Sequence, residues 1–418
     1  MNVEIINTGS ELMLGRVLNT HQQWLCRRLA DLGHVVTRQV AVADAGNEIR
    51  QAVREALTRA DLIIATGGLG PTSDDLTREL IAGLLGKKLI QNQSVVEHID
   101  RFFAKRNRPR PPRTSVEAFV PEGAEVFLNR NGTAPGLAMK IEPNQFRGDR
   151  KTSWLVMLPG PPRELRPMFD DSVVPLLQRE FAEEIFVCRT LRSSGIGESL
   201  VQEMVEADLQ PLVAGGLDLG YCARPGAVDV RLSAHGANAE NTVRQAGAIV
   251  QRILGANIFG LDDDELEQVV VRLLTAQKKT LALAESCTGG LISNRITNVP
   301  GASEVFLGGV VSYANSSKVS FLGVHPNDLQ SHGAVSDVVA RQMAVGAREK
   351  FGSNFALAVT GIAGPGGGTP ENPVGTVFIA LASPAGLEVK KAFNPWDRET
   401  FKQVTAQQAL ELLRIQLI

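Results

Sequence analysis

The first 170 residues alternate short apolar runs with segments in which apolar residues recur every three or four positions. Val3–Asn7 and Asp61–Thr66 are nearly unbroken apolar runs, the pattern of strands that are buried on both faces. Thr20–Leu32 and Glu48–Leu57 have helical spacing, and His34–Val42 between them is strand-like. This order predicts a βαβαβ unit, and therefore a parallel sheet covered by helices.

After about residue 170 the pattern changes to a strand, a helix, two strands joined at Pro225-Gly226, a helix and a short strand. This β-α-β-β-α-β order is typical of a small α+β domain of the ferredoxin-like type. A KH-type RNA-binding module is the alternative, but its basic GxxG clamp is missing. We therefore interpret residues 171–261 as a connecting domain. Its predicted elements are Ile185–Leu191, Gly197–Ala207, Leu217–Cys222, Val228–Ala234, Asn238–Leu254 and Asn257–Gly260.

The last part, residues 262–418, returns to alternating helices and strands. Two neighbouring strands near its end are joined by a Pro-Ala-Gly turn, which predicts an antiparallel edge on an otherwise parallel sheet. We expect an α/β domain. Its predicted elements are Leu266–Ala276, Thr280–Glu285, Gly289–Asn298, Val305–Ser312, Asp337–Lys350, Phe355–Thr360, Gly375–Ser383, Leu387–Phe393 and Arg398–Leu417.

Composition narrows the class of protein. The 418 residues are too many for one core, and 44% of them are hydrophobic, enough for two or three domains. Lys plus Arg number 43 and Asp plus Glu 45, a balance that argues against a nucleic-acid-binding protein. The four cysteines fit no zinc or CxxC motif. The amino terminus lacks a signal-peptide pattern, and no apolar run reaches the ~18 residues of a membrane span, so we expect a cytoplasmic protein.

One strand of the last part ends at a serine. Thr280–Glu285 leads into Ser286, and Thr288-Gly289-Gly290 follow before a predicted helix. A hydroxyl at such a turn is exposed at the carboxyl edge of the sheet, and the helix amino terminus offers N–H groups to an oxyanion. The glycines let backbone and substrate approach closely. Ser286 is therefore a candidate nucleophile, and the alternative is that it only caps the helix.

A serine nucleophile needs a base. Tyr313 and Lys318 follow the apolar strand Val305–Val311 and so leave the sheet at the same edge as Ser286. A partly desolvated lysine with a lowered pKa can serve as the base, as in Ser-Lys hydrolases. The alternative is a solvated surface lysine. The two histidines of this part, His325 and His332, lie in a loop-like stretch, and we interpret them as structural.

A glycine-rich loop, TGIAGPGGG at 360–368, follows a third strand, Phe355–Val359. So much glycine beside a hydroxyl suits a loop that cradles a phosphate or a ribose with backbone N–H groups. The GK[ST] ending of a Walker loop is missing, and an inert surface loop is the alternative. Cys287 is a competing nucleophile, but a catalytic thiol normally needs a nearby histidine.

Gly/Pro-rich turns also gather at strand ends of the first domain, where ligands of parallel sheets bind. In TGGLGPTSDDLTRE at 66–79, Gly67, Gly68 and Gly70 would let the backbone wrap a phosphate. Asp74 and Asp75 supply carboxylate oxygens for a hard cation such as Mg²⁺, or else cap a helix. The other turns, which can also be ordinary loops, are Thr8–Glu11, Asn131–Gly136 and Leu158–Pro162.

The motifs AESCTGG, GGVVSYANSSK, GAVS and TGIAGPGGGTPENPVGTV closely resemble the CinA carboxy-terminal domain, the nicotinamide mononucleotide deamidase family, over nearly all of residues 262–418. The resemblance implies hydrolysis of the nicotinamide mononucleotide carboxamide to nicotinate mononucleotide and ammonia, without a cofactor. It implies Ser286 as the nucleophile, activated by Tyr313 and Lys318. The substrate-binding residues that it implies are Thr288, Gly289, Gly290, Thr360, Gly361, Gly364 and Arg398, the last pairing with the phosphate.

The turns of the first domain resemble the molybdopterin-binding fold, and their full set is similar to the CinA amino-terminal domain over about residues 1–170. The segments SGIGES at 194–199 and YCARPG at 221–226 extend the resemblance, so the whole chain is identified as a member of the full-length CinA family. It implies a molybdopterin-binding-like α/β domain, a ferredoxin/KH-like α+β connecting domain and an α/β deamidase domain. A homodimer is also implied.

The resemblance adds a metal-dependent ADP-ribose pyrophosphatase activity, which yields AMP and ribose 5-phosphate. We expect Mg²⁺, Mn²⁺ or Co²⁺, with K⁺ as a further candidate, to be held by Asp74, Asp75 and Glu79. The nucleotide contacts that we expect in this domain come from Gly9, Gly67, Gly68, Gly70 and Thr133.

The expected partners are small nucleotides, namely nicotinamide mononucleotide and ADP-ribose, with no nucleic acid and no membrane. Two rival hypotheses stay open. One is a molybdopterin- or pterin-binding protein with a degenerate last domain, and the other is a non-enzymatic protein of competence or DNA damage. The intact set of Ser286, Tyr313 and Lys318 weighs against both, because a degenerate domain would be expected to lose one of the three.

Overall fold

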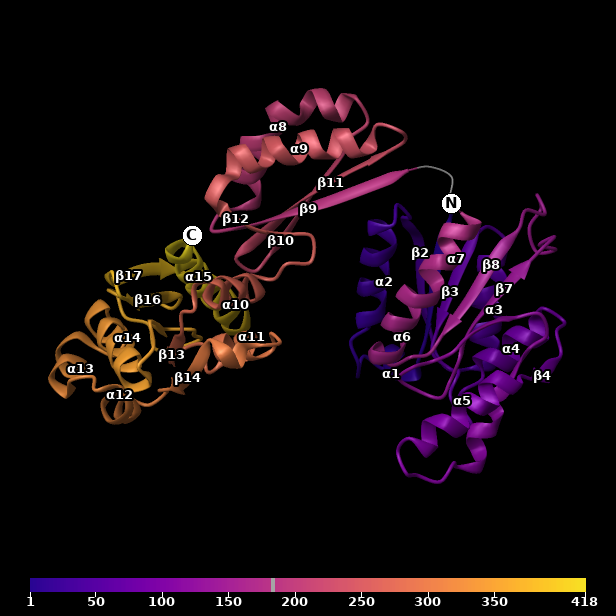
Figure 1. Cartoon of the computed structure of the whole chain (residues 1–418), viewed down its shortest axis with the longest axis horizontal. Coiled ribbons are helices and arrows are strands. Elements are labelled where there is room, and N and C mark those ends of the chain that lie inside the picture. Colours follow the sequence, from indigo (N-terminus) through magenta and orange to yellow (C-terminus); the bar gives the residue numbers. More distant parts are fainter. Residues whose placement is uncertain (182–184) are drawn as a thin grey trace. The chain divides into compact units, whose positions relative to one another are not determined.

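The computed structural model describes residues 1–181 and 185–418, and the chain forms two compact units, Met1–Ile185 and Phe186–Ile418 (Figure 1). The second unit contains both the connecting domain and the last domain. The first unit extends beyond the boundary that was predicted at residue 170. The helical segment that crosses this boundary is buried in the core of the first unit through Phe169, Val173 and Leu176, so the expected boundary is corrected to about residue 185.

The first unit is built on a six-stranded sheet in the order β2-β1-β3-β8-β7-β6. The first four strands are parallel, and β7 and β6 add an antiparallel edge. The predicted βαβαβ order is confirmed. The strands are β1 (Val3–Thr8), β2 (Val36–Val42), β3 (Leu62–Thr66), β6 (Glu125–Phe127), β7 (Gly136–Ile141) and β8 (Ser153–Leu158), with a separate pair β4 (Leu89–Gln91) and β5 (Phe119–Pro121).

Helices cover both faces of this sheet (Figure 1). On one face, α2 buries Leu25 and Leu29 against the segment containing Phe169; on the other, α3 buries Ile49 and Val53. Each helix presents one apolar stripe at 3.6-residue spacing, which is why the sheet strands between them are apolar throughout. The helices are α1 (Ser10–Met13), α2 (Thr20–Asp31), α3 (Gly46–Leu57), α4 (Thr77–Leu84), α5 (Gln93–Ala104), η1 (Pro112–Ala118), α6 (Pro162–Met168), η2 (Phe169–Val173) and α7 (Val174–Glu180).

The connecting domain is a four-stranded antiparallel sheet in the order β10-β11-β9-β12, with α8 and α9 packed on one face (Figure 1). The predicted β-α-β-β-α-β order is confirmed. Buried Arg192 on β9 pairs with Asp229 and with Glu265, where the last domain begins, so the two domains share one ion-pair network. The elements are β9 (Phe186–Ser194), α8 (Glu198–Ala214), β10 (Asp218–Arg224), β11 (Ala227–His235), α9 (Ala239–Leu254), η3 (Gly255–Asn257) and β12 (Ile258–Leu261).

The last domain has a five-stranded sheet in the order β14-β13-β15-β16-β17. The first three strands are parallel and the last two antiparallel, as the sequence predicts. Helices α10, α11 and α15 cover one face, and α12 and α14 the other. The elements are α10 (Leu266–Gln277), β13 (Leu281–Glu285), α11 (Leu291–Thr297), η4 (Ala302–Glu304), β14 (Phe306–Val311), α12 (Asn315–Leu322), α13 (Pro326–His332), α14 (Asp337–Phe351), β15 (Phe355–Gly361), β16 (Thr376–Ser383), β17 (Gly386–Phe393) and α15 (Arg398–Leu417).

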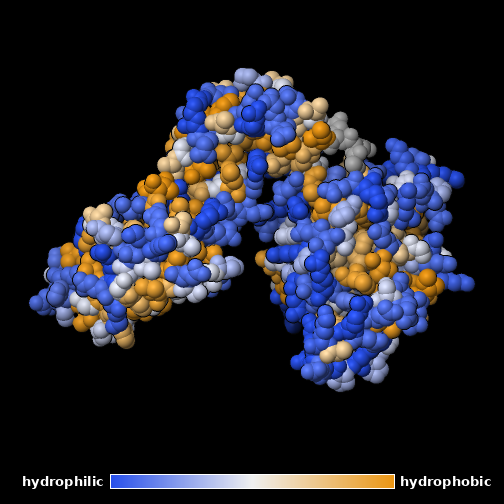
Figure 2. Space-filling model, in the orientation of Figure 1, coloured by the Kyte–Doolittle hydropathy of each residue, from blue (hydrophilic) through white to orange (hydrophobic). Residues whose placement is uncertain are grey.

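The face shown in Figure 2 is largely hydrophilic on both units, with apolar side chains distributed among charged ones. Within residues 1–181 and 185–418, no helix is both long enough and apolar enough to cross a bilayer.

Candidate active sites

Three neighbouring strands of the last domain end at one edge of the sheet. β13 lies between β14 and β15, and all three run in the same direction. Ser286 comes directly after β13, Tyr313 lies two residues after β14, and the glycine-rich loop follows β15. The ladder continues past the strand ends, since Ser286 N donates to Val359 O at 3.0 Å. The three predicted loops are therefore neighbours in space.

Ser286 and Lys318 form a hydrogen-bonded pair at this edge. The distance from Lys318 Nζ to Ser286 Oγ is 3.1 Å. Lys318 projects from α12, is 1% exposed, and also donates to the carbonyl oxygens of Ser312 at 2.8 Å and Tyr313 at 3.5 Å. Burial lowers the pKa of Lys318, because an ammonium group loses its hydration there. The solvated surface lysine is therefore ruled out, and the amine is suited to accept a proton from Ser286.

The competing groups are not placed for catalysis. Burial raises the pKa of the Cys287 thiol to about 12, so it stays protonated at neutral pH and is a poor nucleophile. His325 occupies the N-cap position of α13, where its backbone N donates to Gln342 Oε1 at 2.8 Å, and the ring of His332 contacts Ser331 Oγ at 2.9 Å. Neither histidine has a described hydrogen bond to Ser286.

Tyr313 lies at the site and contacts Arg398. Its side chain is 61% exposed, and its hydroxyl accepts a hydrogen bond from Arg398 Nη2 at 2.5 Å. Arg398 Nη1 also donates to Gly364 O at 2.8 Å. Lys318 meets only the carbonyl oxygen of Tyr313. The described hydrogen bonds of Tyr313 thus go to Arg398 and Lys318 and not to Ser286, so its expected part in activating Ser286 stays a prediction; Arg398 joins two of the three loops.

Glu285, the residue before Ser286, was missed by the sequence analysis. It is 1% exposed and its carboxylate accepts five hydrogen bonds. Three of them come from backbone N–H groups at the start of α11. The sequence analysis had expected these N–H groups to stabilise an oxyanion. The donors are Thr288 Oγ1 at 2.7 Å, Gly290 N at 3.0 Å, Ile292 N at 3.1 Å, Ser293 N at 2.8 Å and Ser293 Oγ at 2.6 Å.

Two predicted substrate-binding hydroxyls are likewise occupied. Thr288 donates to Glu285, and buried Thr360 donates to Ala334 O at 2.7 Å. Each hydroxyl has its one proton bonded inside the protein, so it could meet a substrate only as a hydrogen-bond acceptor, and both assignments stay predictions. Gly289 and Gly290 have φ values of 63° and 94°, so the turn after the nucleophile needs glycine.

A second cation was also missed. A methyl group added at Gly289 would lie 3.9 Å from Lys402 Nζ. Lys402 stands four residues after Arg398 on α15, so both side chains project from the same side of the helix. The i, i+4 spacing of two basic residues was the available sequence signal. Together they give this edge two positive charges that suit a phosphate.

A cavity of about 510 Å³ lies at the strand ends of the first unit. The loops after the adjacent parallel strands β1, β3 and β8 line it. Gly67 has φ 98°, and a methyl group there would lie 2.6 Å from Thr8 Oγ1, so only glycine lets these loops meet. The predicted residues on its wall are Gly9, Gly67, Gly68, Gly70, Asp74, Asp75 and Thr133.

Glu79 does not join this cavity. It lies on α4, is exposed, and pairs with Arg78 Nη2 at 2.9 Å, so its assignment as a metal ligand is corrected. Asp75 accepts from Thr72 N at 2.9 Å and from the Thr72 hydroxyl. Among residues 1–181 and 185–418, no three acidic, histidine or cysteine side chains are close enough to hold a metal ion. The donors fit a Mg²⁺ ion that takes one or two carboxylates from the protein and its other oxygens from phosphates and water.

Glu117 is a further carboxyl group on the cavity wall, supplied by η1. It is 1% exposed; Thr133 Oγ1 donates to its Oε1 at 3.1 Å, and its Oε2 has no partner within the described part of the chain. Burial raises the pKa of Glu117 to about 7, against the opposing effects of Thr133 and the Arg78 guanidinium. The Asp75 and Glu164 carboxylates raise the pKa further.

We expect Glu117→Gln to stabilise the first unit at pH 8 and to have little effect at pH 5. A carboxyl whose pKa rises from 4.5 to about 7 on folding binds more protons in the folded state, so stability falls as pH rises through this range. The pKa difference of about 2.5 corresponds to a loss of about 3 kcal/mol in the free energy of unfolding of the wild type at high pH. The variant avoids this loss because glutamine is neutral. Urea unfolding at the two pH values measures it, with exposed Glu122→Gln as the matched control. An equal effect of Glu117→Gln at both pH values would contradict the raised pKa.

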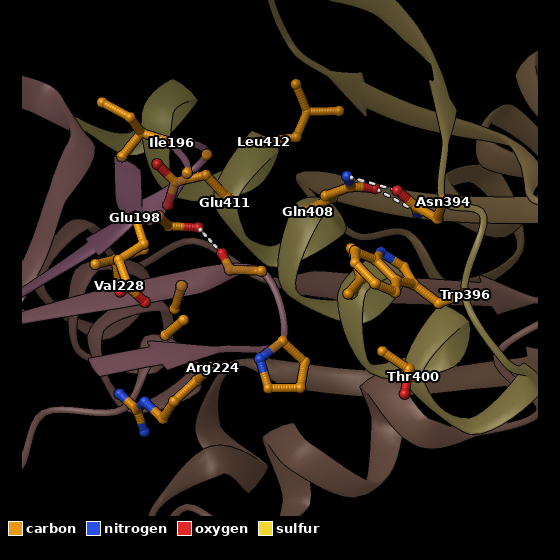
Figure 3. A pocket seen from close by; sticks show the side chains of 18 of the residues that line it. Ile196, Glu198, Arg224, Val228, Asn394, Trp396, Thr400, Gln408, Glu411 and Leu412 are labelled. Atoms are coloured by element: carbon orange, nitrogen blue, oxygen red, sulfur yellow. Dashed lines mark hydrogen bonds between the residues drawn. The ribbon is translucent and has the colours of Figure 1, made fainter. Parts of the chain in front are cut away.

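A larger cavity, about 920 Å³, lies in the second unit between the connecting domain and α15. The segments SGIGE at 194–198 and ARPG at 223–226 line it, but Ser286, Tyr313 and Lys318 do not. Figure 3 shows Asn394 and Gln408 bonded to each other rather than free to bind a ligand. The Ser286–Lys318 pair thus lies outside the lining of this larger cavity.

Three family models together match nearly the whole chain. Residues 4–179 match a model described as "Probable molybdopterin binding domain", residues 188–260 match "Damage-inducible protein CinA KH domain", and residues 263–417 match "CinA C-terminal domain". The connecting domain is thus KH-like, which confirms the ferredoxin/KH-like α+β domain that the resemblance implies.

Full-length relatives show the same extent of similarity. A "CinA-like protein" of Akkermansia muciniphila is 44% identical over 98% of this chain and 96% of its own length. A relative from Moorella thermoacetica, provisionally named a competence-damage inducible protein, is 43% identical over 99% of this chain and 98% of its own. The solved structure of competence/damage inducible protein CihA from Agrobacterium tumefaciens is 39% identical and covers 37% of this chain and 96% of its own, with a TM-score of 0.35.

Proposed function

The chain belongs to the CinA family over its full length, and on that premise we propose that its last domain hydrolyses the carboxamide of nicotinamide mononucleotide. The observation that supports this proposal most strongly is the 3.1 Å contact between Ser286 Oγ and the buried amine of Lys318. A hydroxyl beside a desolvated lysine at a glycine-rich sheet edge suits acyl transfer. Release of ammonia from nicotinamide mononucleotide by the purified protein tests the assignment.

In the first half of the reaction, neutral Lys318 takes the proton of the Ser286 hydroxyl as Oγ attacks the carboxamide carbon. The amine keeps its place through its hydrogen bonds to the carbonyl oxygens of Ser312 and Tyr313. The C–N bond then breaks, and Lys318 returns the proton to the leaving nitrogen, which departs as ammonia. The product is an ester between Ser286 and the nicotinate group.

In the second half, water attacks the ester carbon and Lys318 removes its proton. The C–O bond to Ser286 breaks, and the proton restores the hydroxyl. Nicotinate mononucleotide leaves with the carboxylate. This sequence needs no metal, since every proton moves between Ser286, Lys318, water and the substrate.

We expect the other groups at this sheet edge to bind the mononucleotide. Arg398, which is bonded to Gly364 O, and Lys402, which lies beside Gly289, suit its phosphate. Arg398 is preorganised by Tyr313 and by the Gly364 carbonyl oxygen, so less conformational freedom is lost when a phosphate binds. The predicted glycines, Gly289, Gly361 and Gly364, then contribute backbone surface rather than side-chain hydrogen bonds.

A second proposed function concerns the cavity of the first unit, where we expect ADP-ribose to be cleaved to AMP and ribose 5-phosphate. The supporting observation is that Asp74 and Asp75 line a cavity edged by glycine turns. These carboxylates would hold a divalent cation jointly with the pyrophosphate oxygens, and such an ion neutralises charge that develops on phosphate. A molybdopterin- or pterin-binding protein would need none of this hydrolytic chemistry.

We expect Asp75→Asn to lower ADP-ribose cleavage by about 100-fold and to leave deamidation unchanged. Asparagine can keep the hydrogen bonds from Thr72 but removes the negative charge, so the variant separates cation binding from turn structure. AMP formation at several Mg²⁺ concentrations measures the effect. Glu79→Gln is the control and should cleave at the normal rate, because Glu79 does not line the cavity. Full activity of Asp75→Asn would refute the ligand assignment.

A further inference from the structure

Glu285 is the most completely bonded carboxylate described around the deamidase site. It is the last residue of β13 and directly precedes Ser286. Its five donors are spread over the turn after the nucleophile and the first turn of α11. A carboxylate that accepts this many hydrogen bonds while 1% exposed is fixed in one orientation.

These hydrogen bonds enclose the nucleophile. Upstream, Glu285 is held in the sheet, and its carbonyl oxygen accepts from Ser312 N at 2.8 Å. Downstream, its carboxylate holds Thr288 and Ser293. Ser286 therefore lies inside a loop whose two ends are tied to one residue. Ser312 in turn accepts from Lys318 Nζ, so the base is held by the same strand end.

We propose that Glu285 is the positioning residue of the deamidase site: it fixes the turn that holds Ser286 Oγ against Lys318 Nζ. This role rests on the proposed function of Ser286 as the nucleophile. The N–H groups of Gly290, Ile292 and Ser293 already donate to the Glu285 carboxylate. These three groups therefore do not stabilise an oxyanion of the reaction.

Glu285 acts through geometry and not through its charge on the base. The carboxylate of Glu285 meets its five donors in the turn and in α11, and none of these hydrogen bonds is to Lys318. The negative charge of Glu285 is instead neutralised by the partial positive charges of the N–H groups that it accepts from. Removing the charge should therefore misplace the nucleophile without moving the pH at which Lys318 loses its proton.

The test compares Glu285→Gln with the full-length wild type by two readouts. The amide Nε2 of glutamine is a donor and cannot accept the N–H groups that the carboxylate oxygen accepts. We expect kcat for nicotinamide mononucleotide to fall by about 10- to 100-fold with KM changed less than about threefold, since small misplacement of a reacting atom has effects of this size. The inflection of the pH profile should stay where it is in the wild type.

The second readout does not depend on the natural substrate. A fluorophosphonate labels activated serines, and intact mass gives the rate at which Ser286 is labelled. We expect labelling of Glu285→Gln to be slower by the same 10- to 100-fold. A wild type that is labelled at Ser286 but releases no ammonia from nicotinamide mononucleotide would refute the proposed substrate and leave Glu285 in its role.

Two milder variants test the same role if the Glu285→Gln protein does not fold. Thr288→Val and Ser293→Ala each remove one hydroxyl donor and leave the three N–H donors in place. Each should slow labelling and kcat by about two- to tenfold, and the double variant by more. The proposal is overturned if these variants and Glu285→Gln, when folded by circular dichroism, react at the wild-type rate, or if the pH profile shifts.

Discussion

Replacing Ser286 by alanine should lower ammonia release from nicotinamide mononucleotide by about 10⁴- to 10⁶-fold, the scale on which loss of a nucleophilic serine acts. The hydroxyl is the only part removed, and Lys318 keeps its hydrogen bonds to Ser312 and Tyr313. The fold should therefore persist, and ADP-ribose cleavage in the other unit should be unaffected. Both products can be measured on the same preparation.

Ser316→Ala is the matched control for this experiment. Ser316 is an exposed serine on α12, within the same sequence motif as Lys318 but without a described contact to Ser286. It should release ammonia at the wild-type rate. If Ser286→Ala keeps normal turnover, Ser286 is not the nucleophile and the mechanism fails.

Replacing Lys318 by methionine should lower kcat/KM by about 10²- to 10⁴-fold, the usual contribution of a general base. In the wild type, kcat/KM should rise with pH, because only the neutral amine accepts the serine proton and burial lowers the pKa of Lys318 below its usual 10.5. The rise should level off as pH passes this lowered pKa. Activity at the acidic end should accordingly be poor.

Lys318→Arg distinguishes a base from a fixed positive charge. Arginine keeps the charge but is not deprotonated at any usable pH. If Lys318 only stabilised negative charge on the substrate, Lys318→Arg would retain most activity; we expect it to lose as much as Lys318→Met. Circular dichroism and thermal unfolding confirm that each variant is folded, because the site is buried.

The positions of Ser286, Tyr313 and Lys318 at one sheet edge could be predicted from the sequence. Parallel strands end at the same edge, and three apolar runs each stop at a motif of small polar residues. What could not be predicted was the partner of each hydroxyl. Tyr313 binds Arg398, 85 residues away, and Thr360 binds Ala334. Such contacts depend on helix positions that periodicity does not determine.

Glu285 had a local signal that went unused. An acidic residue just before a helix amino terminus commonly accepts its free N–H groups. That signal predicts a structural carboxylate and argues against an oxyanion site at the same N–H groups. Lys402 also had a signal, because it follows Arg398 by one helical turn.

In the first unit, the glycine turns at the strand ends were predictable and Glu117 was not. Glu117 reaches the cavity from η1, a segment with no periodic pattern, and its raised pKa comes from burial that only the folded chain creates. Glu79 follows Asp75 by four residues, but it does not line the cavity. On α4 its side chain instead turns to Arg78 and solvent. The expected homodimer, cytoplasmic location and cation preference stay predictions.

The most direct test of the central claim is the rate of ammonia release from nicotinamide mononucleotide by the purified wild-type protein, compared with nicotinamide riboside, nicotinamide and glutamine at equal concentration. The account predicts rapid release from the mononucleotide and at least about 100-fold slower release from the others, since Arg398 and Lys402 are proposed to bind its phosphate. No release from the mononucleotide, or equal release from nicotinamide or glutamine, would contradict it.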